Sequence, residues 1–202
     1  MSESHREYFN TLAACWDQMM NDDAAFPRLL ERFKIKPGDI VLDTGAGTGR
    51  MTGHILRMIG KSGIVVAQDI AEDMLDAGRK KFEHPGLIWI CNDACMLSLR
   101  NHIFDKILCF SAFPHFHDPI KVLAEFHRVL KPGGHLLILH MTDSQTLNQF
   151  HAGLDAPVQH DHLPDLQTMV QMLVDADFSI CEAEENPDLY WVRSCISPFD
   201  PL

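Results

Sequence analysis

The chain has 202 residues, 46% hydrophobic and 22% charged, a length that suits one domain with a full core. Its 17 Lys and Arg residues against 28 Asp and Glu give a formal charge of −11, which disfavours binding to phosphate backbones. No apolar stretch approaches the roughly 20 residues that cross a bilayer, and the polar first ten residues lack the apolar region of a signal peptide. We therefore expect a cytoplasmic monomer or homodimer that neither binds nucleic acid nor spans a membrane.

Short apolar runs alternate along the chain with amphipathic stretches. Residues 1–34 are expected to form a helical cap, 35–140 a cofactor-binding core, 141–164 a lid or insertion, and 165–202 a closing helix and strand pair. Strands are predicted at 40–43, 63–69, 87–91, 106–110, 135–140, 178–183 and 189–196, and helices at 50–59, 71–82, 119–130 and 165–176. The alternation predicts an α/β fold: a Rossmann-like, doubly wound, seven-stranded sheet, mostly parallel with a C-terminal antiparallel strand and helices on both faces.

The six cysteines form no CxxC pair and lie in apolar segments, so we expect reduced and mostly buried thiols. No spacing typical of a metal centre is present, and no metal ligand is assigned from the sequence.

A glycine-rich turn follows the first predicted strand, in Asp43-Thr44-Gly45-Ala46-Gly47-Thr48-Gly49-Arg50. Glycines allow a tight turn and a close approach of the backbone to a ligand. The spacing G-x-G-x-G differs from the G-x-G-x-x-G of dinucleotide sites, because Arg50 occupies the position of the last glycine. The negative charge of Asp43 would also repel a bound pyrophosphate, whereas it would attract a cationic ligand.

This segment resembles motif I of class I S-adenosylmethionine-dependent methyltransferases, and the resemblance continues through about residue 140. Asp69 and Ile70 end the second predicted strand, where the family holds the ribose hydroxyls. Asn92-Asp93-Ala94 matches the segment that contacts adenine, and Phe110 ends the fourth strand beside the cofactor. The resemblance therefore implies an S-adenosyl-L-methionine site formed by Asp43, Gly45, Ala46, Gly47, Asp69, Ile70, Met74, Asp93, Ala94 and Phe110.

The segment Phe9–Asp17 resembles the leading helix of the small-molecule subgroup that contains the ubiquinone/menaquinone biosynthesis methyltransferases. In that subgroup an aromatic side chain closes over the methionine end of the cofactor, which points to Trp16. Simple packing of Trp16 on the sheet is the alternative. The resemblance implies a small-molecule methyl acceptor.

Histidines recur near the expected carboxyl edge of the sheet. His140 and His151 are the first candidates for a general base or an acceptor-binding group, with His115 in reserve, because imidazole titrates near neutrality. We therefore expect a histidine-rich acceptor site. Two alternatives stay open: a metal-bearing or metal-assisted substrate, and a regulatory protein that binds S-adenosylmethionine without turnover.

Overall fold

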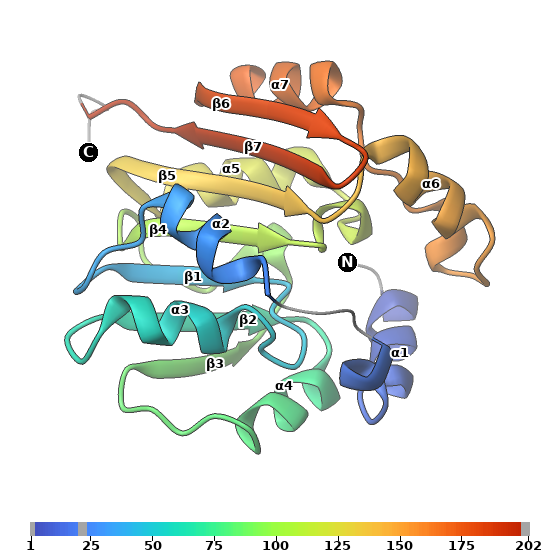
Figure 1. Ribbon diagram of the computed structural model, residues 1–202, viewed down its shortest axis with the longest axis horizontal. Coiled ribbons are helices and arrows are strands. Elements are labelled where there is room, and N and C mark those ends of the chain that lie inside the picture. Colours follow the sequence, from blue (N-terminus) through green and yellow to red (C-terminus); the bar gives the residue numbers. More distant parts are fainter. Residues whose placement is uncertain (1–2, 20–23, 199–202) are drawn as a thin grey trace.

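A seven-stranded sheet forms the centre of the computed structural model, which describes residues 3–19 and 24–198. The strand order is β3-β2-β1-β4-β5-β7-β6 (Figure 1). The strands are β1 (Ile40–Thr44), β2 (Ile64–Asp69), β3 (Leu87–Cys91), β4 (Phe104–Phe110), β5 (Leu130–His140), β6 (Ser179–Asn186) and β7 (Leu189–Cys195). β1 to β5 pair in parallel, whereas β7 is antiparallel to both of its neighbours, so the predicted fold is confirmed.

β5 is longer than predicted. The expected turn over residues 131–134 lies within the strand, because Leu130 already pairs with Phe104. The pairing shifts register between Phe104 and Lys106, and Gly133 takes a φ of +76°, which an L side chain rarely adopts. The chain therefore bends here without leaving the sheet.

Helices cover both faces of the sheet. They are α1 (Glu3–Leu12), α2 (Phe26–Phe33), α3 (Thr52–Ile59), α4 (Glu72–Arg79), α5 (Pro119–Val129), α6 (Ser144–Ala152) and α7 (Leu166–Asp175), with short 3-10 turns η1 (Trp16–Met19), η2 (Ala94–Met96), η3 (Phe113–His115) and η4 (Val158–His160). α2 and α3 lie on one face, and α5 and α7 lie on the other (Figure 1). α4 ends at Arg79, three residues earlier than predicted.

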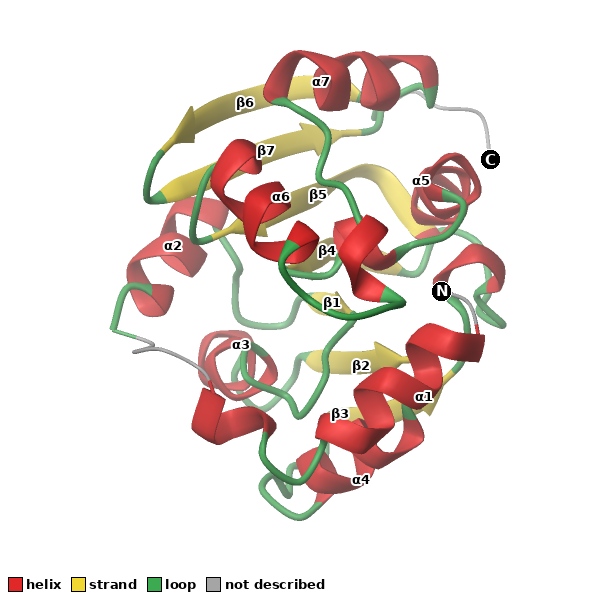
Figure 2. Ribbon diagram, turned by 90° about the vertical axis from the view of Figure 1, so that its right-hand side faces the viewer, coloured by secondary structure: helices red, strands yellow, loops and turns green. Residues whose placement is uncertain are grey.

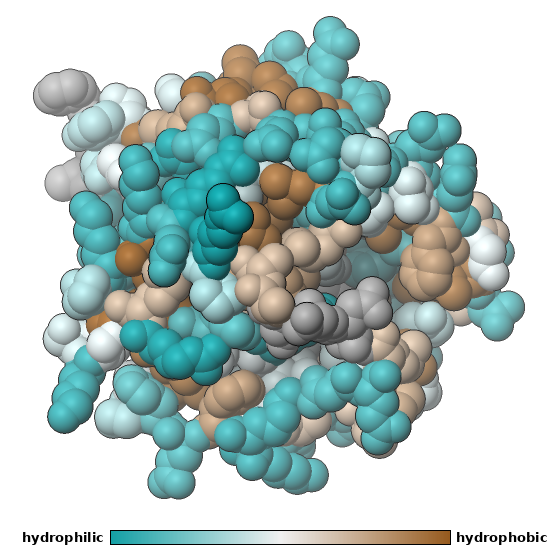
Figure 3. Space-filling view, viewed as in Figure 1, coloured by the Kyte–Doolittle hydropathy of each residue, from teal (hydrophilic) through white to brown (hydrophobic). Residues whose placement is uncertain are grey.

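Two apolar clusters result from the alternation of side chains along the strands. Leu137 and Leu139 of β5 pack in the cluster of α2 and α3, whereas Leu136 and Ile138 pack in the cluster of α5 and α7. All four are fully buried, and burying a side chain of this size contributes about 1.5–3 kcal/mol to stability. On the face that carries α2 and α3, brown hydrophobic groups form scattered patches among hydrophilic ones (Figure 3).

The cysteines are less buried than predicted. Only Cys109, on the central strand β4, is buried, while Cys91 is exposed and the other four are half-buried. Cys91 and Cys181 lie on β3 and β6, the two outermost strands of the sheet, which have a neighbour on one side only.

The carboxyl edge of the parallel strands is covered by segments from both ends of the chain. α1 and α6 both lie across this edge in Figure 2. Residues 141–164, expected as a lid or insertion, hold α6 and η4, and residues 3–34 hold α1, η1 and α2 in their described part. In the part of the chain that the structure describes, no helix combines the length and apolar character that a membrane span requires.

Candidate active site

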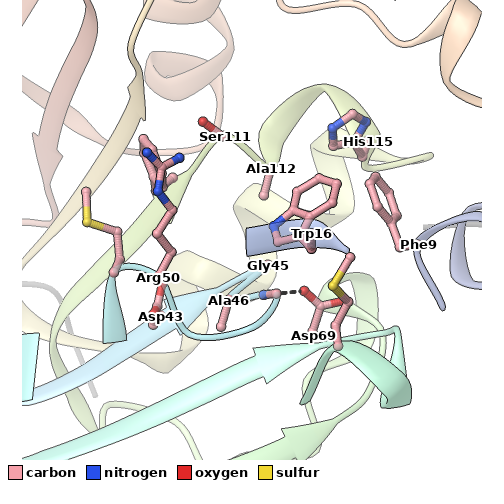
Figure 4. Close-up of a pocket in the computed structure, with 14 residues that line it drawn as sticks. Phe9, Trp16, Asp43, Gly45, Ala46, Arg50, Asp69, Ser111, Ala112 and His115 are labelled. Carbon is pink, nitrogen blue, oxygen red and sulfur yellow. Dashed lines mark hydrogen bonds between the residues drawn. The ribbon is translucent and has the colours of Figure 1, made fainter. Parts of the chain in front are cut away.

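A pocket opens at the carboxyl ends of β1, β2 and β4, with about 680 Å³ of empty space including its mouth. In Figure 4, Arg50 and Asp43 lie at one end of the pocket and Phe9 and His115 at the other, with Trp16 between them. Its lining is Phe9, Trp16, Asp43, Gly45, Ala46, Gly47, Arg50, Met51, Asp69, Met74, Phe110, Ser111, Ala112 and His115.

The glycine turn forms the floor of this pocket, and two of its glycines cannot be replaced freely. Gly45 and Gly47 take φ values of +64° and +54°, which L side chains rarely adopt. A Cβ added at Gly45 would lie 2.3 Å from the Cβ of Ala112. A Cβ at Gly47 would point to the indole nitrogen of Trp16, 3.6 Å away. The turn thus brings bare backbone to the surface of the pocket.

Two buried carboxylates flank the turn. Asp69 accepts hydrogen bonds from the backbone N–H groups of Gly47 (2.8 Å, Figure 4) and Ala71 (2.9 Å). Asp43 accepts one from the hydroxyl of Thr52 at 2.6 Å. Burial raises the pKa of Asp43 to about 7, and the proximity of Asp69 adds to the rise. Burial likewise raises the pKa of Asp69, against the hydrogen bonds from the backbone. Both carboxylates would gain from a ligand that brings positive charge and hydroxyl donors.

An aromatic wall closes one side of the pocket. The ring centroids of Phe9 and Trp16 are 5.8 Å apart in an edge-to-face arrangement. Asp17, the next residue, accepts hydrogen bonds from Thr48 at 2.6 Å and from Lys81 at 2.7 Å. These bonds fix η1 on the glycine turn, which explains how a short 3-10 turn holds Trp16 at the pocket.

Asp161 joins two histidines at the rim. As the C-cap residue of η4, it accepts from Nε2 of His5 on α1 at 2.9 Å and pairs with Nδ1 of His115 at 2.5 Å. Burial opposes ionisation of Asp161, but the hydrogen bonds from His115 and His5 outweigh it and lower the pKa to about 2. Asp161 is therefore an ionised carboxylate that links three segments distant in sequence.

Two further histidines lie next to His115. The rings of His115 and His151 are 5.2 Å apart, and Nδ1 of His151 bonds the backbone oxygen of Asp161 at 3.0 Å. His140 is 2% exposed, and its buried Nε2 has no hydrogen-bond partner among the described residues. Burial lowers the pKa of His140 to about 3, with smaller contributions from His115 and His151, so its imidazole is neutral near pH 7.

The pocket brings together most of the residues singled out from the sequence. Those that line it are Trp16, Asp43, Gly45, Ala46, Gly47, Asp69, Met74, Phe110 and His115, whereas Ile70, Asp93, Ala94, His140 and His151 do not. Asp93 instead caps η2 by accepting from the backbone N–H of Cys95 at 3.0 Å. His160 and His162, which lie in residues 141–164 like His151, are exposed.

Sequence reasoning missed several residues of the site: Phe9, Arg50, Met51, Ser111 and Ala112 in the lining, and His5 and Asp161 at the rim. Ser111 and Ala112 follow a predicted strand at the carboxyl edge, and Arg50 follows the glycines. Their places in the sequence could therefore have indicated that they line the pocket. Arg50 stacks its guanidinium over the ring of Phe26 at 4.8 Å. For Asp161, 46 residues after His115, the sequence gives no comparable signal.

The chain is similar in sequence to known methyltransferases. The profile of the methyltransferase domain family matches residues 42–138. The ubiquinone/menaquinone biosynthesis C-methyltransferase UbiE of Teredinibacter turnerae is 36% identical over 148 residues, which are 68% of this chain and 59% of that protein. UbiE of Vibrio parahaemolyticus is 36% identical over 147 residues, 67% of this chain and 56% of that protein. The chain thus spans less than three fifths of the length of either relative.

A solved structure extends the similarity to the whole fold. The S-adenosylmethionine-dependent methyltransferase of Aquifex aeolicus superposes with a TM-score of 0.73 over 95% of this chain and 98% of that one, at 21% identity. Together with the glycine turn and the acids that flank it, the sequence matches assign the family: this chain belongs to the class I S-adenosylmethionine-dependent methyltransferases, and within them it is similar to UbiE.

Proposed function

We propose that this protein transfers the methyl group of S-adenosylmethionine to a small molecule. The observation that carries the proposal is the pocket itself, in which two buried carboxylates and a bare glycine turn lie opposite an imidazole. The similarity to UbiE, which is named for C-methylation in quinone biosynthesis, supports an acceptor of low molecular weight. The chain acts as one methyltransferase domain, with residues 141–164 as its lid.

The residues present fit the cofactor. A carboxylate oxygen has more than one lone pair, so Asp69 retains acceptor capacity for the ribose hydroxyls beside its two backbone bonds. Asp43 supplies negative charge for the cationic part of the ligand, and the glycine turn leaves room for it. When bound, S-adenosylmethionine supplies an electrophilic methyl group. The protein then has to align the acceptor and exclude water.

His115 acts as the general base for acceptors that lose a proton. Its Nδ1 is paired with Asp161, so the proton on Nδ1 points to the carboxylate and Nε2 is the nitrogen that remains for the acceptor. A carboxylate in this position fixes the tautomer and stabilises the imidazolium that forms. Asp161 is thus a positioning residue. His5, on the other carboxylate oxygen, holds Asp161 in place.

The neighbouring histidines complete the acceptor side. The buried Nε2 of His140 is an unused hydrogen-bonding group. His151 packs against His115 on the side away from the pocket lining, while Phe9 offers the acceptor an apolar surface next to His115. The acceptor is therefore a molecule with both an aromatic or apolar part and a polar group.

Transfer of labelled methyl from S-adenosylmethionine into a size-fractionated extract of the source cells tests the proposal. We expect label in the low-molecular-weight fraction with wild-type protein and none with Asp69→Ala, which lacks the ribose-binding carboxylate. Label confined to macromolecules would contradict the acceptor class. Cofactor binding by calorimetry without any transfer would instead favour a regulatory binding protein.

A metal-assisted reaction is the second candidate, and one observation favours it. The ligand atoms of His5, His115 and Asp161 all lie within 4.8 Å of one another, and imidazole and carboxylate are ligands of many divalent metals. The same extract assay with and without a chelator separates the two reactions, because proton removal by His115 alone does not respond to the chelator.

A further inference from the structure

Three potential metal ligands gather far from the pocket, on the antiparallel end of the sheet. His135 lies on β5, Cys195 on β7 and Cys181 on β6. His135 and Cys195 are register partners, so their side chains share one face of the sheet. His135 precedes His140 by five residues, which is roughly 16 Å along the strand from the carboxyl edge. The cluster is therefore separate from the proposed reaction site.

The distances within this cluster match a tetrahedral metal site. The sulfur atoms of Cys181 and Cys195 are 3.4 Å apart, and the Cys181 sulfur is 3.9 Å from Nδ1 of His135. All three ligand atoms lie within 4.8 Å of one another. Bond lengths of 2.3 Å to sulfur and 2.0–2.1 Å to nitrogen put tetrahedral ligands about 3.8 Å (S to S) and about 3.6 Å (S to N) apart. Small movements of the thiols would bring the ligand atoms to these tetrahedral distances.

A β-bulge puts Cys181 in this position. The pairing of β6 with β7 shifts register between Ile180 and Glu182, so Cys181 has no partner of its own in the ladder. Bulges re-aim side chains, and this one brings the sulfur beside Cys195. Glu182, the next residue, is already bound to Arg193 and to the indole of Trp191.

The charge of the ligand set also fits. Two thiolates and one neutral imidazole bound to a divalent ion leave no net charge at the centre.

We propose that His135, Cys181 and Cys195 bind one Zn²⁺ ion, with water as the fourth ligand. Nitrogen and sulfur ligands select zinc over magnesium or calcium. The other two candidate groups in the described residues include carboxylates: His5, His115 and Asp161 at the pocket, and Asp93, Cys95 and His117. On binding, the two thiols each lose a proton to solvent as two Zn–S bonds form. The ion would tie β6 and β7 to β5.

The test is zinc uptake by the reduced, metal-free full chain, measured by competition with a chromophoric chelator and by elemental analysis. We expect one zinc per chain, release of about two protons near neutral pH, and thiolate-to-metal absorption when Co²⁺ replaces Zn²⁺. Loss of a residue that only supports a metal ligand costs 10–100-fold in metal affinity. Loss of a ligand itself should cost more, so Cys181→Ser and Cys195→Ser should each weaken zinc binding about 100-fold or more. His135→Asn should do the same.

Cys95→Ser and His5→Asn are the matched controls, since they disrupt the two competing groups and should leave zinc binding unchanged. Thermal unfolding of the metal-free variants shows whether each one folds. Zinc binding that survives both Cys181→Ser and Cys195→Ser in folded protein would overturn the proposal, as would loss in Cys95→Ser instead. Reduced wild-type protein that takes up no zinc would overturn it as well. This includes a protein in which Cys181 and Cys195 form a disulfide in air but bind no zinc after reduction.

Discussion

His115 and Asp161 form the pair on which the proposed reaction depends. His115→Ala should lower kcat about 10²–10⁴-fold, which is the usual contribution of a general base. Asp161→Asn should lower kcat by a factor in the same range, because the tautomer of His115 is no longer fixed. His117→Ala is the control: it is exposed and two residues away, so kcat should not change. The measurement is single-turnover methyl transfer.

A purely structural role for His115 makes a different prediction. If the imidazole acts only by packing, His115→Ala should weaken binding of the cofactor, and added imidazole should not restore activity. We expect unchanged cofactor affinity by calorimetry and partial rescue of kcat by imidazole. Weakened cofactor binding without rescue would contradict the role as a base.

Asp43 links the pocket to the pH dependence of stability. Its pKa is about 7 in the folded ligand-free protein against 3.8 in the reference state, so the folded state holds the proton more tightly between these values. The contribution of Asp43 to folding stability therefore falls as pH rises from about 4 to 7, by at most about 1.4 kcal/mol per pH unit. Above about pH 7 it levels off. Urea unfolding of wild type and Asp43→Asn from pH 5 to 8 measures this difference. A constant difference between the two proteins would contradict it.

At the scale of the elements, the contact between the glycine turn and the segment after β4 can be tested directly. Gly45→Ala puts a methyl group 2.3 Å from the Cβ of Ala112 at a positive φ, so we expect a loss of about 2 kcal/mol or more in unfolding free energy. Cofactor binding should be lost with it. Gly153→Ala is the matched control, because its φ is −89° and its nearest neighbour is 3.4 Å away. Equal stability of the two variants would show that the turn can relax.

The elements themselves were largely predictable, because the parallel strands β1 to β4 are apolar runs and the glycine turn after β1 changes the direction of the chain. The predicted order of strands and helices is confirmed by the sheet topology. The bulge at Cys181 and the early pairing of Leu130 were not predictable, since both depend on the register with a neighbouring strand. Asp161 was missed for a related reason. It is one of 28 acidic residues, and only the folded chain brings it to His115.

For the whole molecule, ligand binding and unfolding are coupled. S-adenosylmethionine at a hundred times its Kd should add about 2.7 kcal/mol to the unfolding free energy, which for a chain of this length corresponds to an increase in Tm of about 5–10 °C. Asp69→Ala should abolish the increase, and NAD should not produce it. Thermal scanning with each ligand measures the shift. Stabilisation by NAD alone would contradict the assignment of the cofactor. The cytoplasmic location and the monomer or homodimer state stay predictions.

Different segments of the chain form the two proposed sides of the pocket, and this affects how the protein could acquire new substrates. The proposed cofactor contacts come from the turns after β1 and β2, whereas the proposed acceptor side is formed by α1, η3 and the segment that ends in Asp161. Mutations that reshape the acceptor side therefore need not touch the cofactor contacts. Libraries confined to α1 and residues 141–164 should yield altered acceptor preference with methyl-donor use retained, which makes this small protein a practical starting point for directed evolution.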